Sequence, residues 1–378
     1  MTGWLATLER RAQLRARAGL TRRLRPRAPG EPVTDLAGND YLGLTRHPEV
    51  VAAAAEALTG YGLGATGSRL VRGTTDAHTA LEQELADWLG AEQALVYSSG
   101  YLANLGVLTG LVRPRTRIVT DAHNHASLVD GCRLSGAETV VVPHADPAAV
   151  AAALADAKGR PALVVTESVF SVDGDLAPLA ELHQITRAHG AVLVVDDAHG
   201  LGLLGPAGAG GVVAAGLAGE PDVVVTATLS KALGGAGGVV AGPAALIRHL
   251  VDTGRTFIYD TAPPPAVVAG VRAAVRLARA GDSLRAELRE RAAAAVTRLA
   301  TAGLTPSTPA AGILSVPAPD AEAAVAWANR CAARRVAVGC FRPPSTPDNT
   351  SRLRLTINVG VPRGDFDAAL DVVVEAAP

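Results

Sequence analysis

Lysine is nearly missing from this chain. Only Lys158 and Lys231 occur among 378 residues, and arginine supplies every other basic side chain. Chemistry that needs a neutral amine nucleophile must therefore use one of these two lysines or the N-terminus. Lys158 lies in the polar turn AKGRP, which is typical of a solvated loop charge.

Cysteine, aromatic residues and net charge are also scarce. The three cysteines, Cys132, Cys331 and Cys340, are too few and too badly spaced for a disulfide framework or a zinc site, so we expect a reducing cytoplasm and no metal. Aromatic residues make up 3% of the chain, and the net charge of −1 gives no electrostatic footprint for a nucleic-acid partner.

Long hydrophobic runs are absent too. No stretch approaches the roughly 20 apolar residues of a membrane span, so we expect no membrane partner. Residues 1–25 lack the central apolar block of a secretory signal. Because these residues are rich in arginine, they resemble a transit peptide, but the acidic Glu9 falls within them. The favoured interpretation is a helix over 1–25 that packs on the body of the protein.

What the chain does contain is a series of apolar, β-branched runs separated mostly by helical or loop stretches. Continuous apolar strands are typical of a parallel sheet buried on both faces, and their alternation with helices indicates an α/β fold. The predicted strands of this seven-stranded, mostly parallel sheet are 94–97, 117–120, 139–142, 162–166, 192–195, 223–226 and 238–241.

The rest of the chain predicts smaller units around this sheet. Residues 1–45 are an N-terminal helix and connector, 46–275 the large domain, and 276–378 a small α+β domain. A connecting helix is expected over 266–302. Within the small domain, strands are expected at 313–317, at 336–340 and in RLRLTIN, with a helix near 320–335 and another at the end.

Lys231 lies within TATLSKALGGAGG at 226–238, directly after a predicted strand. Ligands of such sheets bind at the carboxyl ends of the strands. Small residues crowd the backbone there, so an amine can be partly desolvated and its pKa lowered, as a Schiff-base lysine requires. A lysine that simply closes a turn is the alternative.

Other polar side chains follow neighbouring strands. Asp196 in DDAHG leaves a buried strand and needs a cation, which a protonated pyridine nitrogen could supply, and His199 could face the same ligand. An Asp–His pair that caps a loop is the alternative. His125 in DAHNHASLVDG begins a helix, either at the ligand or as a capping turn, and Ser171 ends another strand segment.

The segment SSGYLAN, residues 98–104, opens a helix with hydroxyls and a glycine. Free N–H groups and the helix dipole favour an anion there, so Ser99, Gly100 and Tyr101 predict a phosphate cradle. Together with the lysine, the aspartate and the histidines, this set matches what pyridoxal 5'-phosphate (PLP) needs. GLGATG, residues 62–67, fits a dinucleotide fingerprint only formally, because no strand precedes it.

The motifs DDAHG, TLSKALGG, SSGYLAN, NHASL, GLGATGSR and RPPSTPDNTSRLRLT together resemble the α-oxoamine synthases from about Leu20 onward. The resemblance implies a PLP-dependent transferase of fold type I that condenses an amino acid with an acyl thioester and releases CO2. It also implies a homodimer. RPP at 342–344 and an arginine soon after GL near the N-terminus favour the branch that uses L-alanine with pimeloyl-CoA or a pimeloyl-acyl-carrier protein.

The resemblance assigns a role to each candidate residue. Lys231 would form the Schiff base and remove the α-proton, Asp196 would pair with the pyridine nitrogen, and His199 would bind the ring's phenolate oxygen. His125 would stack on the ring and orient the substrate. The remaining cofactor contacts would come from Ser99, Gly100, Tyr101, Ser171, Thr228, Ser230 and Thr261, and the substrate contacts from Arg354 for the amino-acid carboxylate and Arg22, Arg342 and Ser345 for the acyl chain.

Two points leave alternatives open. Asp260 stands before Thr261 where the family usually has serine or threonine, which weakens a role for that turn in phosphate binding. Arg352 and Arg354 share one strand face, and without the family they would be read as exposed arginines. Other possible functions are a related synthase that uses glycine or another acyl-CoA, an aminotransferase, or a non-catalytic PLP-binding protein.

Overall fold

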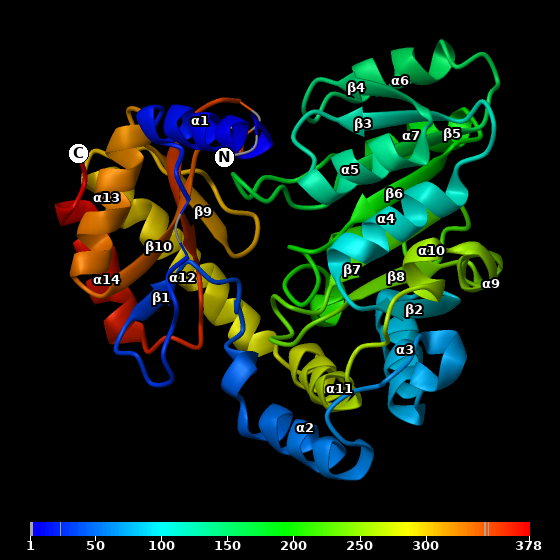
Figure 1. Ribbon diagram of the computed structural model, residues 1–378, viewed down its shortest axis with the longest axis horizontal. Helices are drawn as coiled ribbons and strands as arrows, with labels where there is room; N and C mark the ends of the chain where they lie inside the picture. Colours follow the sequence, from blue (N-terminus) through cyan, green and yellow to red (C-terminus); the bar gives the residue numbers. More distant parts are fainter. Residues whose placement is uncertain (1–2, 23, 344, 347) are drawn as a thin grey trace.

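Two sheets organise the chain, each at the centre of its own lobe (Figure 1). The computed structural model describes residues 3–22, 24–343, 345–346 and 348–378. The larger lobe holds a seven-stranded sheet and the smaller lobe a four-stranded sheet. Both chain termini lie in the smaller lobe (Figure 1).

The seven-stranded sheet has the order β2-β8-β7-β6-β5-β3-β4, and only β8 runs antiparallel to its neighbours. All seven predicted strands and the mostly parallel arrangement are therefore confirmed. Their bounds are β2 Gln93–Tyr97, β3 Arg117–Asp121, β4 Glu138–Val142, β5 Ala162–Glu167, β6 Val192–Asp196, β7 Val223–Thr228 and β8 Gly238–Gly242.

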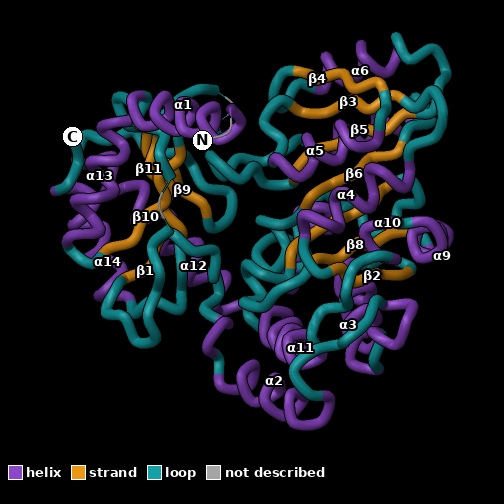
Figure 2. Tube along the Cα trace, viewed as in Figure 1, coloured by secondary structure: helices purple, strands orange, loops and turns teal. Residues whose placement is uncertain are grey.

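Helices cover both faces of this sheet, as the apolar runs predicted (Figure 2). Val164 belongs to the core on one face and Val165 to the core on the other. The first core continues through α11 into the smaller lobe. The helices of the larger lobe are α2 Pro48–Tyr61, α3 Asp76–Leu89, α4 Gly100–Leu111, α5 Ala126–Ser135, α6 Pro147–Ala155, α7 Leu179–Ala188, α8 Gly211–Ala214, α9 Ala244–Thr253, α10 Arg255–Ile258 and α11 Pro265–Arg279.

The smaller sheet has the order β1-β10-β11-β9, with β1 parallel to β10 and the other pairs antiparallel. The N-terminal strand is thus part of the C-terminal sheet, although the domain bounds at 45 and 275 stay predictions. Its elements are β1 Thr34–Leu36, α12 Asp282–Thr301, β9 Ile313–Pro317, α13 Ala321–Ala333, β10 Val336–Phe341, β11 Arg352–Thr356 and α14 Arg363–Glu375.

Two predicted helices differ from the structure. The helix expected over 1–25 is shorter, α1 Gly3–Arg17, and none of its residues is fully buried, while its packing on the body stays a prediction. The connecting helix over 266–302 is two helices, α11 and α12, which Gly281 separates.

No helix within the described residues is long and apolar enough to cross a membrane.

Candidate active site

Lys231 lies in the turn between β7 and β8, at the carboxyl end of β7. Its Nζ is 2.8 Å from Nε2 of His199, and the other ring nitrogen of His199 is 2.7 Å from the Tyr41 hydroxyl. The predicted meeting of Lys231 and His199 is therefore present, and Tyr41 extends the pair. These three side chains form one hydrogen-bonded chain across the strand ends.

Burial lowers the pKa of Lys231 to about 8, although the nearby carboxylates of Asp196 and Glu167 oppose the shift. Burial and the charge of Lys231 hold the pKa of His199 well below its usual value. The histidine is therefore neutral, and the lysine has a substantial neutral fraction near physiological pH. This is the desolvated amine that the sequence predicted.

Asp196 ends β6, next to Thr226 of β7 and Glu167 of β5 in the sheet register. One carboxylate oxygen accepts a hydrogen bond from the Asn104 side chain at 2.6 Å, and the other accepts one from the Ala198 amide at 3.0 Å. Asn104 reaches Asp196 from α4, in front of the sheet edge. The carboxylate is buried but fully oriented, as a partner for a protonated ring nitrogen must be.

His125 caps the N-terminus of α5, and burial lowers its pKa. Its backbone N–H donates to Glu167 Oε1 at 2.6 Å, and its Nδ1 is 2.8 Å from Ser127 Oγ. The predicted capping turn is therefore real. Among the described residues, the side-chain hydrogen bonds of His125 use Nδ1, so Nε2 is available for a ligand, while Asp196 and Lys231 act on the ring electrostatically.

The predicted phosphate cradle brings β2, α4 and β7 together. Ser99 caps α4 and accepts from Leu102 N at 3.2 Å. The Thr228 and Ser230 hydroxyls are 2.7 Å apart. A Cβ on Gly100 would lie 3.0 Å from that of Thr228, and one on Gly238 would lie 2.4 Å from the Ser99 carbonyl oxygen. The glycines therefore permit the close approach of the helix start to the lysine turn.

Tyr101 and Thr261 lie at the border of this region. Tyr101 is 42% exposed, and its hydroxyl donates to Asp130 at 2.5 Å. Thr261 pairs with Ser68 in an isolated bridge. The preceding Asp260 accepts a hydrogen bond from Ser98, beside the start of α4.

Arg354 of β11 is buried and joins the two lobes. Its guanidinium donates to the Ser171 carbonyl oxygen at 2.9 Å and to the Asn39 side chain, and it lies over the Phe341 ring. Arg352 on the same strand face is also buried, so the reading of two exposed arginines is wrong. Ser171 meets this arginine through its carbonyl group.

The three acyl-chain candidates also lie together. Arg22 donates to the Ser345 hydroxyl at 2.9 Å, and Arg342 donates to the Gly19 carbonyl oxygen. Arg342 directly follows β10, which pairs with β11. Pro344 of the RPP motif lies outside the described residues.

Sequence reasoning assigned no role to four residues of this site: Asn39, Tyr41, Asn104 and Glu167. Glu167 is fully buried, and burial together with the Asp196 charge raises its pKa. Asn104 could have been noticed as a polar residue within the apolar helix GYLANLGVLTGL. Asn39 and Tyr41 lie in NDYLGL, where nothing in the local pattern indicates a partner 158 residues away.

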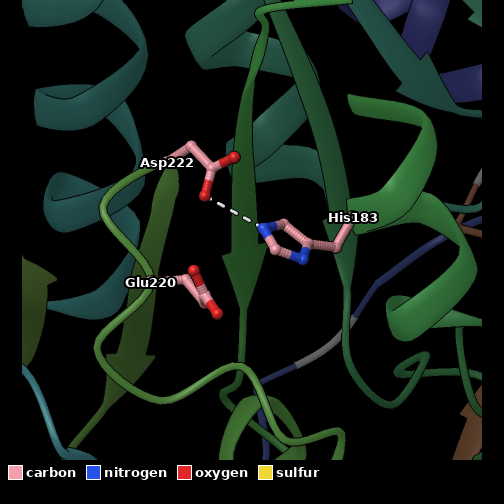
Figure 3. A group of neighbouring side chains, drawn as sticks. All are labelled: His183, Glu220 and Asp222. Atoms are coloured by element: carbon pink, nitrogen blue, oxygen red, sulfur yellow. Dashed lines mark hydrogen bonds and ion pairs between the residues drawn. The ribbon is translucent and has the colours of Figure 1, made fainter. Parts of the chain in front are cut away.

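A second cluster, His183, Glu220 and Asp222, lies before β7, at the opposite end of the strands (Figure 3). The His183 ring is 2.9 Å from Asp222. Arg187 donates to both carboxylates, so the protein itself supplies their counter-charge. This arrangement explains the cluster as an ion-pair network.

Known proteins resemble nearly the whole chain. The family model for aminotransferase class I and II matches residues 31–373. The 8-amino-7-oxononanoate synthase of Mycolicibacterium smegmatis is 51% identical over 98% of this chain and 96% of its own length, and that of Mycobacterium avium is 51% identical with the same shares.

Solved structures share the fold. A serine palmitoyltransferase from S. paucimobilis with bound PLP–myriocin aldimine superimposes with a TM-score of 0.91 at 31% identity, covering 98% of this chain and 96% of that one. An 8-amino-7-oxononanoate synthase from Francisella tularensis has a TM-score of 0.78 at 25% identity, covering 91% and 97%. By full-length identity and by fold, this chain belongs to the aminotransferase class I and II family, of PLP-dependent fold type I, and within it to the group of 8-amino-7-oxononanoate synthases.

Proposed function

We propose that this protein condenses L-alanine with a pimeloyl thioester, releasing CO2 and the free thiol carrier and forming 8-amino-7-oxononanoate, a step of biotin biosynthesis. The observation that carries the proposal is the half-buried amine of Lys231, whose pKa is lowered to about 8, held 2.8 Å from His199 Nε2 beside the buried carboxylate of Asp196. Relatives about half identical over the full chain support the choice of product.

The residues present fit PLP. The Lys231 amine, whose pKa is lowered, suits the PLP aldehyde, and the buried Asp196 carboxylate suits its ring nitrogen. The start of α4, where Gly100 lies against Thr228, suits the phosphate. When bound, PLP supplies an electron sink for the bonds broken at the amino-acid α-carbon. Lys231 and Asp196 would hold it, with Ser99, Gly100, Tyr101, Ser171, His199, Thr228, Ser230 and Thr261 as further contacts.

The protein's own groups would then position the amino acid and move its proton. Lys231 Nζ, uncharged above its lowered pKa, takes the proton from the α-carbon of L-alanine. His199 holds this amine in place through Nε2, and Tyr41 fixes the histidine from the other side. The His125 ring covers the site from α5 and excludes water.

Arg354 would bind the alanine carboxylate. Its burial lowers its pKa only from a high starting value, so it stays charged. Among the described residues no carboxylate pairs with this buried guanidinium, which favours an incoming carboxylate. Ser171 O and Asn39 already fix its orientation.

The far carboxylate of the pimeloyl chain would meet Arg22 and Arg342, with Ser345 between them. Replacing Arg22 with Met is then expected to raise the KM for the pimeloyl thioester at least tenfold and leave the KM for L-alanine within about twofold. An equal rise in both KM values would contradict this assignment.

A homodimer belongs to the same proposal. Leu63, Val71 and Tyr259 are 84%, 70% and 72% exposed, in segments joined by the Ser68–Thr261 bridge near the phosphate cradle. Exposed apolar clusters of this kind mark interfaces. Light scattering should give twice the chain mass, and Val71→Glu combined with Tyr259→Ser should shift it to the monomer mass.

The test of activity is product formation by purified, PLP-loaded protein. L-alanine, glycine and L-serine are each paired with pimeloyl-CoA, a pimeloyl-acyl-carrier protein and palmitoyl-CoA, and the products and CO2 are quantified. Alanine with a pimeloyl thioester should be preferred at least a hundredfold. The close structural likeness to serine palmitoyltransferases makes serine with palmitoyl-CoA the second candidate, and preference for that pair, or amino-group transfer without CO2 release, would overturn the proposal.

A further inference from the structure

His144 stands outside the chemistry described so far, yet it links the two lobes. It lies two residues after β4, where Nδ1 is 3.0 Å from Asp121 Oδ1 and Nε2 is 2.8 Å from Asp175 Oδ2. Ionised carboxylates only accept hydrogen bonds, so two such partners require both ring nitrogens to donate. Burial alone lowers the pKa of His144, but the hydrogen bonds to Asp121 and Asp175 outweigh it and raise the pKa to about 9.

Two aromatic rings also pack against His144. The His123 ring stacks on the His144 ring with 3.9 Å between the ring centroids and an interplanar angle of 9°. The Phe170 ring meets it edge-on, with 4.3 Å between the centroids. Asp121 is fixed in turn by the amides of His123 and Ala145, at 2.7 and 2.8 Å. One side of His144 is therefore anchored rigidly to the end of β3.

The other side holds a tight loop over residues 170–175. The Phe170 amide donates to the Asp175 carbonyl oxygen and the Gly174 amide to the Phe170 carbonyl oxygen, both at 2.9 Å. This compact turn follows β5 at the carboxyl edge of the large sheet, so fixing Asp175 fixes the whole turn.

The same loop also contacts the smaller lobe. Asp173 pairs with Arg352 and accepts from Ser315 Oγ at 2.6 Å, while the Ser171 carbonyl oxygen receives Arg354 at 2.9 Å. The Ala310 amide donates to the Gly174 carbonyl oxygen at 3.0 Å. The 170–175 loop thus connects the two lobes through polar contacts, and one of these contacts fixes the position of Arg354.

We infer that His144 is a positioning residue for the amino-acid substrate. By binding both Asp121 and Asp175, it fixes the 170–175 loop. The Ser171 carbonyl group of this loop then orients the Arg354 guanidinium toward the substrate carboxylate. This inference rests on the proposed function, because it takes Arg354 as the carboxylate-binding group. It predicts a defect in binding the amino acid that is larger than any change in binding the acyl thioester or PLP, because Ser171 is only one of many cofactor contacts.

The test compares His144→Gln with His189→Gln, a histidine on the surface at the end of α7. The dissociation constant of L-alanine is measured from the absorbance of bound PLP, alongside PLP content and the KM for pimeloyl-CoA. For His144→Gln the alanine constant should rise about tenfold, with PLP content and the pimeloyl-CoA KM within twofold of wild type. His189→Gln should change none of the three.

Asp175→Asn, which keeps the main-chain turn and removes the charge that His144 meets, should give the same selective loss and decides the matter if His144→Gln does not fold. In an Arg354→Lys background, His144→Gln should have little further effect on alanine binding, because the two act through one group. Alanine constants within twofold of wild type in both single variants, or equal losses of alanine and PLP binding, would overturn the inference. If wild-type protein itself gives no response to L-alanine, the proposed function fails first.

Discussion

Lys231, His199 and Tyr41 show how single residues create the reactive amine. The strand end buries Lys231 where a charged ammonium is poorly solvated, while Asp196 and Glu167 limit how far its pKa falls. The result is an amine that changes charge within reach of physiological pH. The pKa of the neighbouring His199 is lowered too, so the histidine competes little for the proton.

The first prediction concerns this amine. An amine is a nucleophile only when uncharged, that is, above its pKa. The rate at which apoprotein captures PLP should therefore rise from pH 6.5, pass its midpoint near pH 8 and level off above pH 9. With an ordinary lysine, whose pKa is about 10.4, the capture rate would keep rising beyond pH 10. Stopped-flow absorbance over this range separates the two profiles.

At this scale the sequence indicated the groups that leave buried strands, such as Lys231 and Asp196, because the edge of a parallel sheet gathers them. It could mark Asn104 only as a polar residue in an apolar helix and could not indicate its partner Asp196, which lies 92 positions away. It also could not indicate Tyr41, which reaches His199 from the N-terminal segment. Tertiary packing alone decides these partners. The roles assigned to individual site residues stay predictions.

At the scale of elements, the site depends on the close approach of the α4 start to the turn between β7 and β8. Gly238 pairs with Tyr97 and Thr228 in the sheet register, directly under the Ser99 carbonyl. Strands were predictable because apolar runs buried on both faces leave a clear pattern. The end of α1 was not, because no fully buried residue of this arginine-rich helix fixes its length.

The second prediction tests this approach with Gly238→Ala. The added Cβ would lie 2.4 Å from the Ser99 carbonyl oxygen, so either the sheet or the start of α4 must shift. We expect the free energy of unfolding to fall by about 2 kcal/mol and the PLP dissociation constant to rise at least tenfold.

Gly364→Ala is the matched control, since a Cβ there meets nothing within 4 Å. Its free energy of unfolding, measured with urea, should stay within about 1 kcal/mol of wild type, on the stabilising side in a helix. Similar losses in both variants would mean that the contact with Ser99 has no special importance.

At the scale of the whole molecule, the two lobes are tied by buried polar contacts as well as a shared core. Arg352 is 4% exposed in its side chain and pairs with Asp173, which is 33% exposed. The alternation in RLRLTI predicted that Arg352 and Arg354 share a face. Their burial was not predictable, because it results from the 170–175 loop folding over β11.

The third prediction follows from this burial. Arg352→Leu removes the guanidinium and leaves Asp173 without its cation, so the free energy of unfolding should fall by about 2 kcal/mol. Arg334→Ala breaks an exposed pair with Glu375, whose side chains are 47% and 60% exposed, and should cost less than about 0.5 kcal/mol. Urea unfolding measures both variants. Equal losses in the free energy of unfolding would argue against a stabilising buried contact between the lobes.

The most direct test of the whole account uses the scarcity of lysine. PLP-loaded protein is reduced with borohydride, digested and analysed by mass spectrometry, so that the cofactor stays on the amine that held it. The account predicts the label on Lys231 alone and loss of both label and visible absorbance in Lys231→Ala, with Lys158→Ala unchanged. Label on Lys158, or a Lys231→Ala protein that keeps its absorbance and turnover, would contradict it.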